Sequence, residues 1–310
     1  MKTTAIVKAG GHQAITSPAM LDRFTQYIDA SPRTVESYSK AVRLFIEWTR
    51  QNGITQPRRE DLIRYRDELA ATHKATTVQT YLIAVRQFFK WTEAENLYTN
   101  VADRVKGVRV QAQHKKDALT PTQAKDVINT LREKGTPEAA RDLAVVALAV
   151  TGGLRTIEIK RAKVEDLRTL GSYTVLYVQG KGRTEKAEYI KITTEVEKLI
   201  RAYLYTRTDA TPGSPLFTSN SNRNTGEELT TRSISRLIKA AIVEAGYNSD
   251  RLTAHSLRHT AVTIALTGGM TLQEAQQFAR HSNIATTTIY AHNLERMNNR
   301  CEETISAALF

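Results

Sequence analysis

The stretch 143–155, Leu-Ala-Val-Val-Ala-Leu-Ala-Val-Thr-Gly-Gly-Leu-Arg, joins an apolar segment to a basic side chain. Residues 143–150 are apolar on nearly every side, which predicts a helix buried in the interior of a domain. Gly152 and Gly153 follow this helix, and a glycine just past the last helical residue is a common helix end. Arg155 is therefore predicted to lie immediately after a buried anchor.

A small sheet is predicted downstream of this anchor. Residues 173–178 and 186–192 are rich in Val, Ile, Tyr and Thr, which is typical of strands. The glycine-flanked turn around Lys181 separates them, so they predict a hairpin with this lysine near its tip. Residues 215–218 predict a short third strand.

The remainder of residues 119–310 is predicted to be helical. The spacing at 120–123 is that of a capping box, which starts a helix, and the same spacing recurs at 271–274. Helices dominate from Arg232 onward. The chain closes with a predicted tail, residues 293–310, in which a charged stretch precedes an apolar end.

Residues 17–105 predict a separate helical domain. Ser-Pro pairs at 17–18 and 31–32 are helix starts, because serine caps the end and proline suits the first turn. Apolar residues recur at helical spacing in further stretches at 61–71 and 78–89. The sequence therefore predicts four or five helices, with the aromatic stripe of the last stretch in their core.

Two segments lie outside these predicted domains. The helical period lapses over residues 106–118, which are polar and basic and predict an interdomain linker. Residues 1–16 show no period and predict a flexible N-terminal arm. The expected fold class is mainly α with a small β-sheet (α+β), in two domains.

Net charge indicates the kind of partner. The 310 residues carry a formal charge of +12, and a basic surface gains free energy by releasing counterions from nucleic acid. An anionic membrane is the second candidate partner. Residues 1–118 hold 19 Lys and Arg against 12 Asp and Glu, and residues 119–310 hold 25 against 20. Both halves are basic, as expected of a chain that encloses a duplex from two sides.

Composition also bounds the compartment. The single cysteine, Cys301, excludes an internal disulfide and a cysteine cluster for zinc, and it fits a reducing environment. No run approaches the ~20 apolar residues of a membrane span, and the first residues lack an apolar stretch of signal-peptide length. A cytoplasmic protein, in the bacterial or archaeal cytosol or nucleoid, is predicted.

Two arginines and a tyrosine suit chemistry on a phosphodiester. Cleavage places negative charge on the phosphate oxygens, and the planar guanidinium groups of Arg155 and Arg258 can clamp them with paired hydrogen bonds. Tyr290 is a weak nucleophile at neutral pH because the pKa of a phenol is near 10, so it needs a base or cationic surroundings. His255 or His281 can serve as that base.

The leaving oxygen needs a proton, and Lys181 is placed to supply it if nearby arginines depress its pKa. No acidic cluster typical of a two-metal nuclease stands out, so no metal and no cofactor are expected. Attack by a tyrosine exchanges one phosphoester for another, which conserves the bond energy for rejoining without ATP. Recombinases and type IB topoisomerases share this property.

Four segments in this order resemble the signature of the tyrosine recombinase (phage integrase) family, of the simple two-domain Xer-like type. They are Thr151-Gly-Gly-Leu-Arg-Thr-Ile-Glu158, Gly180-Lys-Gly182, His255-Ser-Leu-Arg-His-Thr260 and His281-Ser-Asn-Ile-Ala-Thr-Thr-Thr-Ile-Tyr290. The resemblance covers about residues 17–295.

The resemblance assigns a role to each residue of the site. It implies that Arg155 and Arg258 bind the scissile phosphate and that Tyr290 forms a 3′-phosphotyrosine link. Lys181 would be the general acid, His255 would assist proton transfer from the nucleophile, and His281 would hold the phosphate. Glu158 would orient its neighbours. His259 and His292 match no family role and are interpreted as structural.

Two departures from the family pattern stand out. The family usually has Leu-Gly before the histidine at 281, where this chain has Ala279-Arg280. A glycine there relieves left-handed strain, so Arg280 predicts either a different turn or strain on the order of 1 kcal/mol. The second departure is the pair Gly152-Gly153, where one glycine is commoner, and it is expected to alter how freely Arg155 is held.

The resemblance implies a site-specific DNA recombinase whose two domains close around duplex DNA as a C-shaped clamp. Four protomers would exchange strands through a Holliday junction at an inverted-repeat core site, coupled by the tail 293–310 and aided by accessory DNA-bending proteins. Such an enzyme serves a phage, a transposon, another mobile element or chromosome resolution. The alternatives are a type IB topoisomerase and a DNA-binding protein without catalysis.

Overall fold

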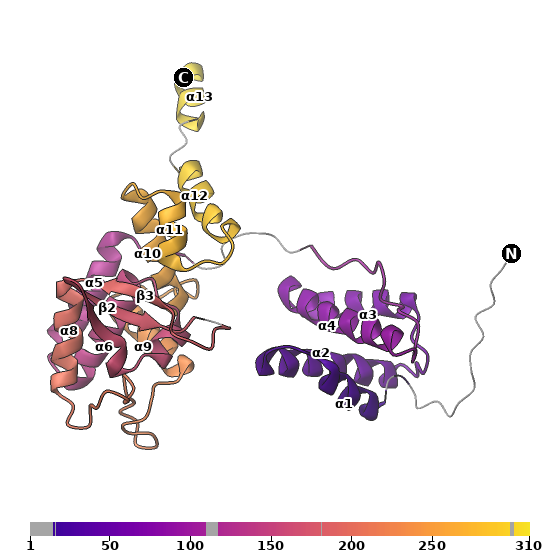
Figure 1. The fold of residues 1–310 in the computed structure, drawn as a ribbon. Coiled ribbons are helices and arrows are strands. Elements are labelled where there is room, and N and C mark those ends of the chain that lie inside the picture. The colour runs from indigo at the N-terminus through magenta and orange to yellow at the C-terminus, as the bar shows by residue number, and fades with distance from the viewer. Residues whose placement is uncertain (1–14, 16, 110–116, 181, 298–300) are drawn as a thin grey trace. The chain divides into compact units, whose positions relative to one another are not determined.

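The computed structural model describes residue 15 and residues 17–109, 117–180, 182–297 and 301–310. The chain divides into two compact units (Figure 1), Met1–Gln113 and His114–Phe310. We call them the helical unit and the mixed unit. The boundary between them lies within residues 106–118, of which 110–116 are outside the described residues.

The described part of the helical unit contains the helices α1 (Pro18–Tyr27), α2 (Pro32–Gln51), α3 (Arg59–Thr72) and α4 (Ala75–Ala94). Both predicted Ser-Pro starts are confirmed, since Ser17 and Ser31 are N-cap residues followed by proline. Ile15 is buried against this unit although it lies in the predicted arm.

Aromatic rings fill the core of the helical unit, as the sequence predicts. Phe24, Phe45, Phe88 and Phe89 are at most 1% exposed. The Phe24 and Phe88 rings meet edge to face with centroids 5.4 Å apart. Burying a phenyl group contributes about 1.5–3 kcal/mol, so these rings account for much of the stability of the unit.

The mixed unit combines helices with a three-stranded sheet. Before the sheet come α5 (Pro121–Glu133), α6 (Pro137–Thr151), α7 (Thr156–Arg161) and the 3-10 helix η1 (Val164–Asp166). The sheet is β1 (Leu167–Leu170), β2 (Tyr173–Val178) and β3 (Glu188–Ile192). After it come α8 (Thr194–Tyr205), α9 (Thr231–Glu244), α10 (Ala254–Thr267), α11 (Leu272–Ala279), α12 (Ala285–Met297) and α13 (Cys301–Leu309). The predicted α+β fold class is confirmed.

The sheet differs from the prediction in its third strand. Its order is β1-β2-β3 with antiparallel pairing. The predicted hairpin is therefore confirmed, whereas the strand predicted at 215–218 is wrong. That segment forms only isolated bridges at Pro215 and Thr218, and proline has no N–H with which to continue a ladder. The true third strand, β1, was missed because its side chains are mostly exposed and show no apolar alternation.

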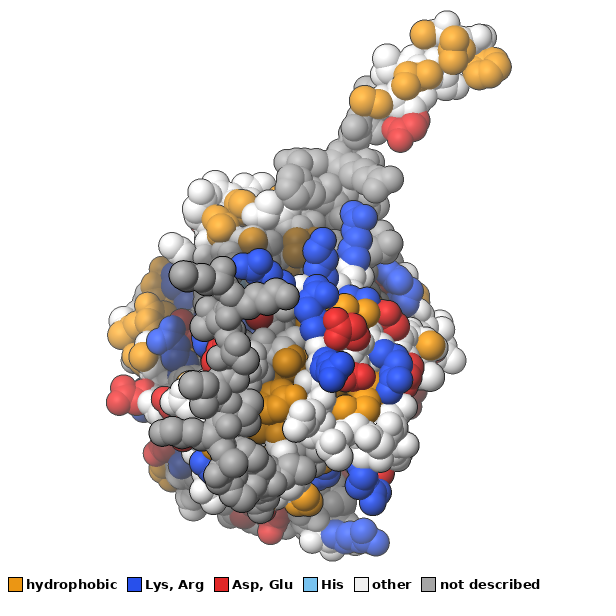
Figure 2. All heavy atoms as spheres, turned by 90° about the vertical axis from the view of Figure 1, so that its right-hand side faces the viewer, with side chains coloured by type: hydrophobic (Ala, Val, Ile, Leu, Met, Phe, Trp, Pro, Cys, Tyr) orange, Lys and Arg blue, Asp and Glu red, His pale blue; other side chains and the backbone are white. Residues whose placement is uncertain are grey.

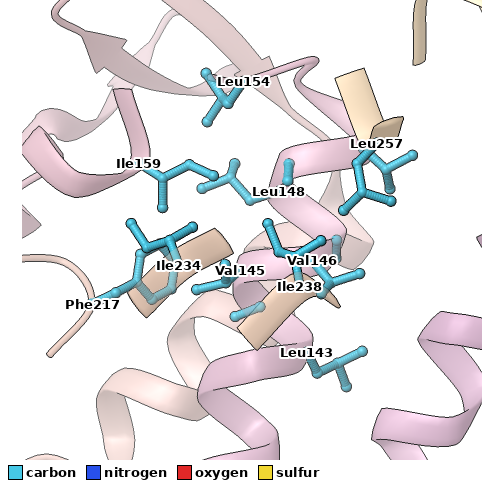
Figure 3. Close-up of a cluster of buried hydrophobic side chains, with 14 of the residues drawn as sticks. Leu143, Val145, Val146, Leu148, Leu154, Ile159, Phe217, Ile234, Ile238 and Leu257 are labelled. Atoms are coloured by element: carbon cyan, nitrogen blue, oxygen red, sulfur yellow. The ribbon is translucent and has the colours of Figure 1, made fainter. Parts of the chain in front are cut away.

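Helix α6 is the centre of the mixed unit. Every residue from Leu143 to Val150 is buried, and Figure 3 shows Ile234 and Ile238 from α9 and Leu257 from α10 gathered around it. The buried helix predicted from the stretch 143–150 is confirmed. Gly152 is its C-cap, and Gly153 takes a left-handed φ of 56°. This turn delivers the chain to Arg155, the N-cap of α7.

The last helix, α13, contrasts with this interior because none of its residues is buried. Figure 2 shows apolar side chains on this helix, and Ile305, Leu309 and Phe310 are all exposed. Among the helices of the described residues, none is long and apolar enough to cross a membrane.

Candidate active site

The loop from α6 to α7 places a buried carboxylate beside Arg155. Glu158 is fully buried. Its Oε2 accepts from the Arg155 backbone N–H at 2.9 Å, and its Oε1 accepts from Arg155 Nη1 at 2.8 Å. Arg280 Nη2 also donates to Oε2, at 3.1 Å. One carboxylate therefore joins two guanidinium groups.

Glu158 is charged despite its burial. Burial raises its pKa, but Arg280 and the hydrogen bonds from Arg155 more than offset this, so the net shift is downward. The attraction of two cationic partners and the hydrogen bonds that they donate offset the cost of removing this carboxylate from water. Glu158 thus carries the negative charge that holds the arginines together.

Arg258, on α10, is 1% exposed. Its Nη1 donates to the Gly153 carbonyl at 2.5 Å and its Nη2 donates to the Ala279 carbonyl. Burial lowers its pKa to about 9, with Arg155 as the second cause. Arg258 therefore remains a cation at neutral pH, and it links the end of α6 to the end of α11.

Tyr290, on α12, is 5% exposed, and its hydroxyl shares a hydrogen bond with His259 Nδ1. Burial raises the pKa of Tyr290 to about 12, although Arg258 and Arg155 act to lower it. The hydroxyl therefore lies within the field of both guanidinium groups. Because the phenol is protonated at neutral pH, it needs a proton acceptor before it can attack.

The histidines line up beside this hydroxyl. The ring of His259 lies 5.1 Å from the Tyr290 ring and 4.5 Å from the ring of His255, which is exposed. The ring of His281 stacks on that of Tyr290 with centroids 6.5 Å apart, and His281 Nδ1 is 2.9 Å from Thr287 Oγ1. Burial, then Arg258 and Arg155, lowers the pKa of His281 to about 4. His281 is therefore neutral at pH 7.

The structure gathers six of the seven residues predicted for the site: Arg155, Glu158, His255, Arg258, His281 and Tyr290. Lys181 lies outside the described residues. Its neighbour Gly180 is held by Arg161, the last residue of α7, whose Nη1 donates to the Gly180 carbonyl at 3.1 Å.

Two further residues contact this site, although the sequence analysis gave neither of them a role in it. His259 was interpreted as structural, yet it contacts the Tyr290 hydroxyl. The signal was its place four residues after His255, which puts both histidines on one face of α10. The second residue is Arg280, at the departure from the family pattern. Its backbone is left-handed, with φ 52° and ψ 46°, so the predicted alternative of strain holds and the turn is kept.

A basic groove opens next to the site. It has a volume of about 900 Å³, and Arg155 and His255 lie on its wall. Helix α9 contributes Arg232, Arg236 and Lys239 to the same groove. A row of cations along a helix is suited to a phosphate backbone.

Guanidinium groups, histidines and a tyrosine beside a basic groove form a site suited to binding a phosphate group. The chain belongs to the phage integrase family, because the model of that family matches residues 117–297. Residues 21–96 match the phage integrase N-terminal SAM-like domain.

Named relatives are consistent with this membership. The chain is 30% identical over 207 residues to a tyrosine recombinase of Synechococcus elongatus. The aligned residues cover 66% of this chain and 63% of that protein. The chain is 30% identical to XerC of Pelobacter propionicus, over 56% of this chain and 55% of that protein. The similarity thus spans between about half and two thirds of these relatives. XerA of Thermococcus kodakarensis is 26% identical, over 87% of this chain and 89% of that protein.

Solved structures share the fold. The XerH site-specific recombinase bound to palindromic difH substrate matches with a TM-score of 0.74 at 19% identity, over 93% of this chain and 85% of that one. A lambda integrase dimer bound to a COC′ core site matches with a TM-score of 0.66 at 16% identity, over 86% of this chain and 96% of that one.

Proposed function

We propose that this protein is a site-specific DNA recombinase that cuts and rejoins duplex DNA through a 3′-phosphotyrosine intermediate. The observation that carries the proposal is the Tyr290 hydroxyl, which meets His259 within the field of Arg155 and Arg258. Family membership and relatives that are themselves recombinases support the same reaction.

In the cleavage step the Tyr290 oxygen attacks phosphorus, and the bond from phosphorus to the 5′ oxygen breaks. Arg155 and Arg258 stabilise the charge on the non-bridging oxygens. By the family resemblance, Lys181 delivers a proton to the 5′ oxygen as it leaves. The reverse sequence, with a 5′ hydroxyl from another strand as nucleophile, rejoins the DNA and needs no ATP, because one ester has replaced another.

The proton of Tyr290 passes first to His259. In this step the hydroxyl donates to Nδ1, which requires a neutral His259 with its proton on Nε2. His255 contacts the ring of His259 and is exposed, so it is placed to assist the transfer towards solvent. His281, neutral at pH 7, can donate one N–H to the phosphate, and Glu158 orients Arg155.

The substrate is double-stranded DNA with an inverted-repeat core site. The groove bearing Arg232, Arg236 and Lys239 opens beside Arg155, so a phosphate backbone lying along α9 would pass the site. The helical unit would add further contacts to the duplex. The net charge of +12 supports a polyanionic partner.

The active assembly is a homotetramer on DNA that resolves a Holliday junction. Helix α13 supports this, because it exposes Ile305, Leu309 and Phe310 and buries none of its own residues. Its apolar face would pack on a neighbouring protomer, with accessory DNA-bending proteins assisting assembly in the bacterial or archaeal cytosol. Removing residues 301–310 should then reduce strand exchange more than cleavage, and equal losses would contradict this role.

The central test is the substitution Tyr290→Phe. A DNA site is first selected from a random duplex library by binding to this variant, and is then rebuilt as a nicked duplex that traps covalent product. The unmodified protein should form a denaturant-resistant adduct on it, whereas Tyr290→Phe should form none and bind equally well. Tyr203→Phe is the matched control, since Tyr203 is also buried and its hydroxyl contacts Thr218 at 3.0 Å.

The same assay separates the alternatives. An adduct from Tyr290→Phe would remove this tyrosine as the nucleophile. Tight binding by the unmodified protein without any adduct would favour a non-catalytic DNA-binding protein. Relaxation of any supercoiled plasmid, without site preference or junction intermediates, would favour a type IB topoisomerase.

A further inference from the structure

We propose that Arg280 is a positioning residue that fixes the Arg155–Glu158 pair from the opposite corner of the site, an inference that rests on the function proposed above. Arg280 stands between α11 and α12, whereas its partners stand at the start of α7. It therefore joins two corners of the fold that are more than 100 residues apart in sequence.

The backbone of Arg280 is in a conformation that disfavours a side chain. Its φ of 52° is left-handed, a region that favours glycine. Among the described residues, the other non-glycine residues with positive φ are Asn96 and Arg104. The side chain of Arg104 is 90% exposed, whereas that of Arg280 is only 7% exposed. Because Arg280 keeps a buried side chain on a strained backbone, we infer that the contacts of its guanidinium matter for the site.

The guanidinium of Arg280 bridges the two corners. Its Nη2 lies 3.3 Å from the Gly152 carbonyl, 3.2 Å from the Gly153 carbonyl and 3.1 Å from Glu158 Oε2. Its Nη1 donates to the Phe278 carbonyl at 2.8 Å, within its own corner. The same side chain thus ties the end of α11 to the end of α6 and to the carboxylate.

Arg155 is positioned through these contacts in two ways. Its Nη2 donates to the backbone carbonyl of Arg280 at 3.3 Å, so the strained turn itself orients the guanidinium. In addition, Arg280 holds Glu158 Oε2, which keeps the carboxylate from turning both oxygens onto the Arg155 guanidinium. A bidentate pair of that kind would occupy N–H groups that a phosphate needs.

The two departures from the family pattern form one arrangement. The Gly153 carbonyl accepts from Arg258 as well as Arg280. A Cβ at Gly153 would lie 2.9 Å from the ring of Phe278, the residue whose carbonyl Arg280 also binds. The second glycine therefore permits the close approach of α11 that brings Arg280 to Glu158.

The first measurement is the cleavage rate of Arg280→Gly on the nicked duplex described above, with saturating protein. Glycine relieves the backbone but removes the bridge, so cleavage should slow by up to about 10²-fold, as expected for a misplaced catalytic group. DNA affinity should change less than about twofold, because Arg155 and the basic groove are retained. Arg280→Lys, which restores one ion pair without the planar fork, should recover part of the rate.

Arg104→Gly is the matched control, because it relieves the same backbone conformation at an exposed arginine. It should cleave at the unmodified rate. Arg280→Gly cleaving at that rate as well would overturn the proposal, as would Arg280→Lys cleaving no faster than Arg280→Gly.

A second measurement does not depend on activity. The melting temperatures of Arg280→Gly, Glu158→Gln and the double variant form a cycle, and the losses should not add, because both single changes break the same contact. Additive losses would show that Arg280 and Glu158 act independently and would overturn the proposal. If the unmodified protein formed no adduct, the proposed function would fail while this cycle still tested the bridge.

Discussion

The interiors of the two units differ in the charge they bury. In the described part of the helical unit, the buried polar residues are Ser39, Thr49 and Thr92, none of them charged. Both threonine hydroxyls donate to carbonyls of their own helix. The mixed unit instead buries charged side chains, among them Glu158 and Arg258. The first interior contains apolar side chains and a few uncharged hydroxyls, and the second contains charge where the chemistry is proposed.

Burying a charged side chain costs free energy, and a well-packed core can form without one. Removing an ion from water is unfavourable by several kcal/mol, and paired ions commonly gain little over apolar side chains of the same size. Burial is the first cause of the lowered pKa of Arg258, which is the direction that this cost predicts. Strongly perturbed groups beside a groove are typical of functional sites. The contrast between the units therefore predicts opposite outcomes for substitutions in each.

The largest effect should follow Arg258→Ala. Losing one fixed donor to a developing charge costs about 10²–10³-fold, and this guanidinium can present two, so cleavage should fall by on the order of 10⁴-fold. The carbonyls of Gly153 and Ala279 would lose their donors, but a buried cation beside Arg155 would also disappear. The melting temperature should therefore change only slightly, whereas the cleavage rate should fall steeply. Cleavage on the nicked duplex and thermal unfolding check the two parts, and unfolding as the main effect would break the contrast.

Phe88→Ala should give the reverse outcome. Phe88 is fully buried, and its removal should lower the free energy of unfolding of the helical unit by about 3–5 kcal/mol. Cleavage at low temperature and saturating DNA should stay within about twofold. Both tryptophans, Trp48 and Trp91, lie in this unit, so fluorescence during denaturation measures its unfolding alone.

Phe88→Leu serves as the graded control, because it retains more of the apolar volume and should lose less stability. A cleavage defect in either variant at a temperature where the unit remains folded would contradict a purely structural core.

Local signals made much of the fold predictable. The Ser-Pro starts of α1 and α2, the capping boxes of α5 and α11 and the buried α6 each rest on residues within one turn or one helix. Strand β1 could not be predicted from such local signals, because it pairs with β2 through its backbone while its side chains are mostly exposed. Backbone pairing of an exposed strand leaves no trace in the apolar pattern.

The candidate site was predictable as a list of residues but not as a network. The resemblance selected six residues that the structure brings together, but it assigned the proton transfer from Tyr290 to His255. The Tyr290 hydroxyl instead contacts His259, which lies 31 residues away in the sequence. Arg280 was recognised as a source of strain, but its bridge to Glu158 spans 122 residues. Contacts of this range depend on how helices pack, which a single sequence does not reveal.

The smallest predicted effect concerns His281 and pH. Its pKa is lowered to about 4 by burial and by Arg258, Arg155, His255 and Arg280, below the ~6.5 of an unfolded chain. The fold thus favours the neutral ring, and the unfolded chain binds the proton first. The resulting stability is fully present above pH 6.5 and is lost as the pH falls towards 4. The melting temperature should consequently drop more between pH 7.5 and 5 for the unmodified protein than for His281→Gln, by about a few degrees. His73→Gln, at an exposed histidine, should behave like the unmodified protein, and identical pH losses in all three proteins would show that folding does not lower the pKa of His281.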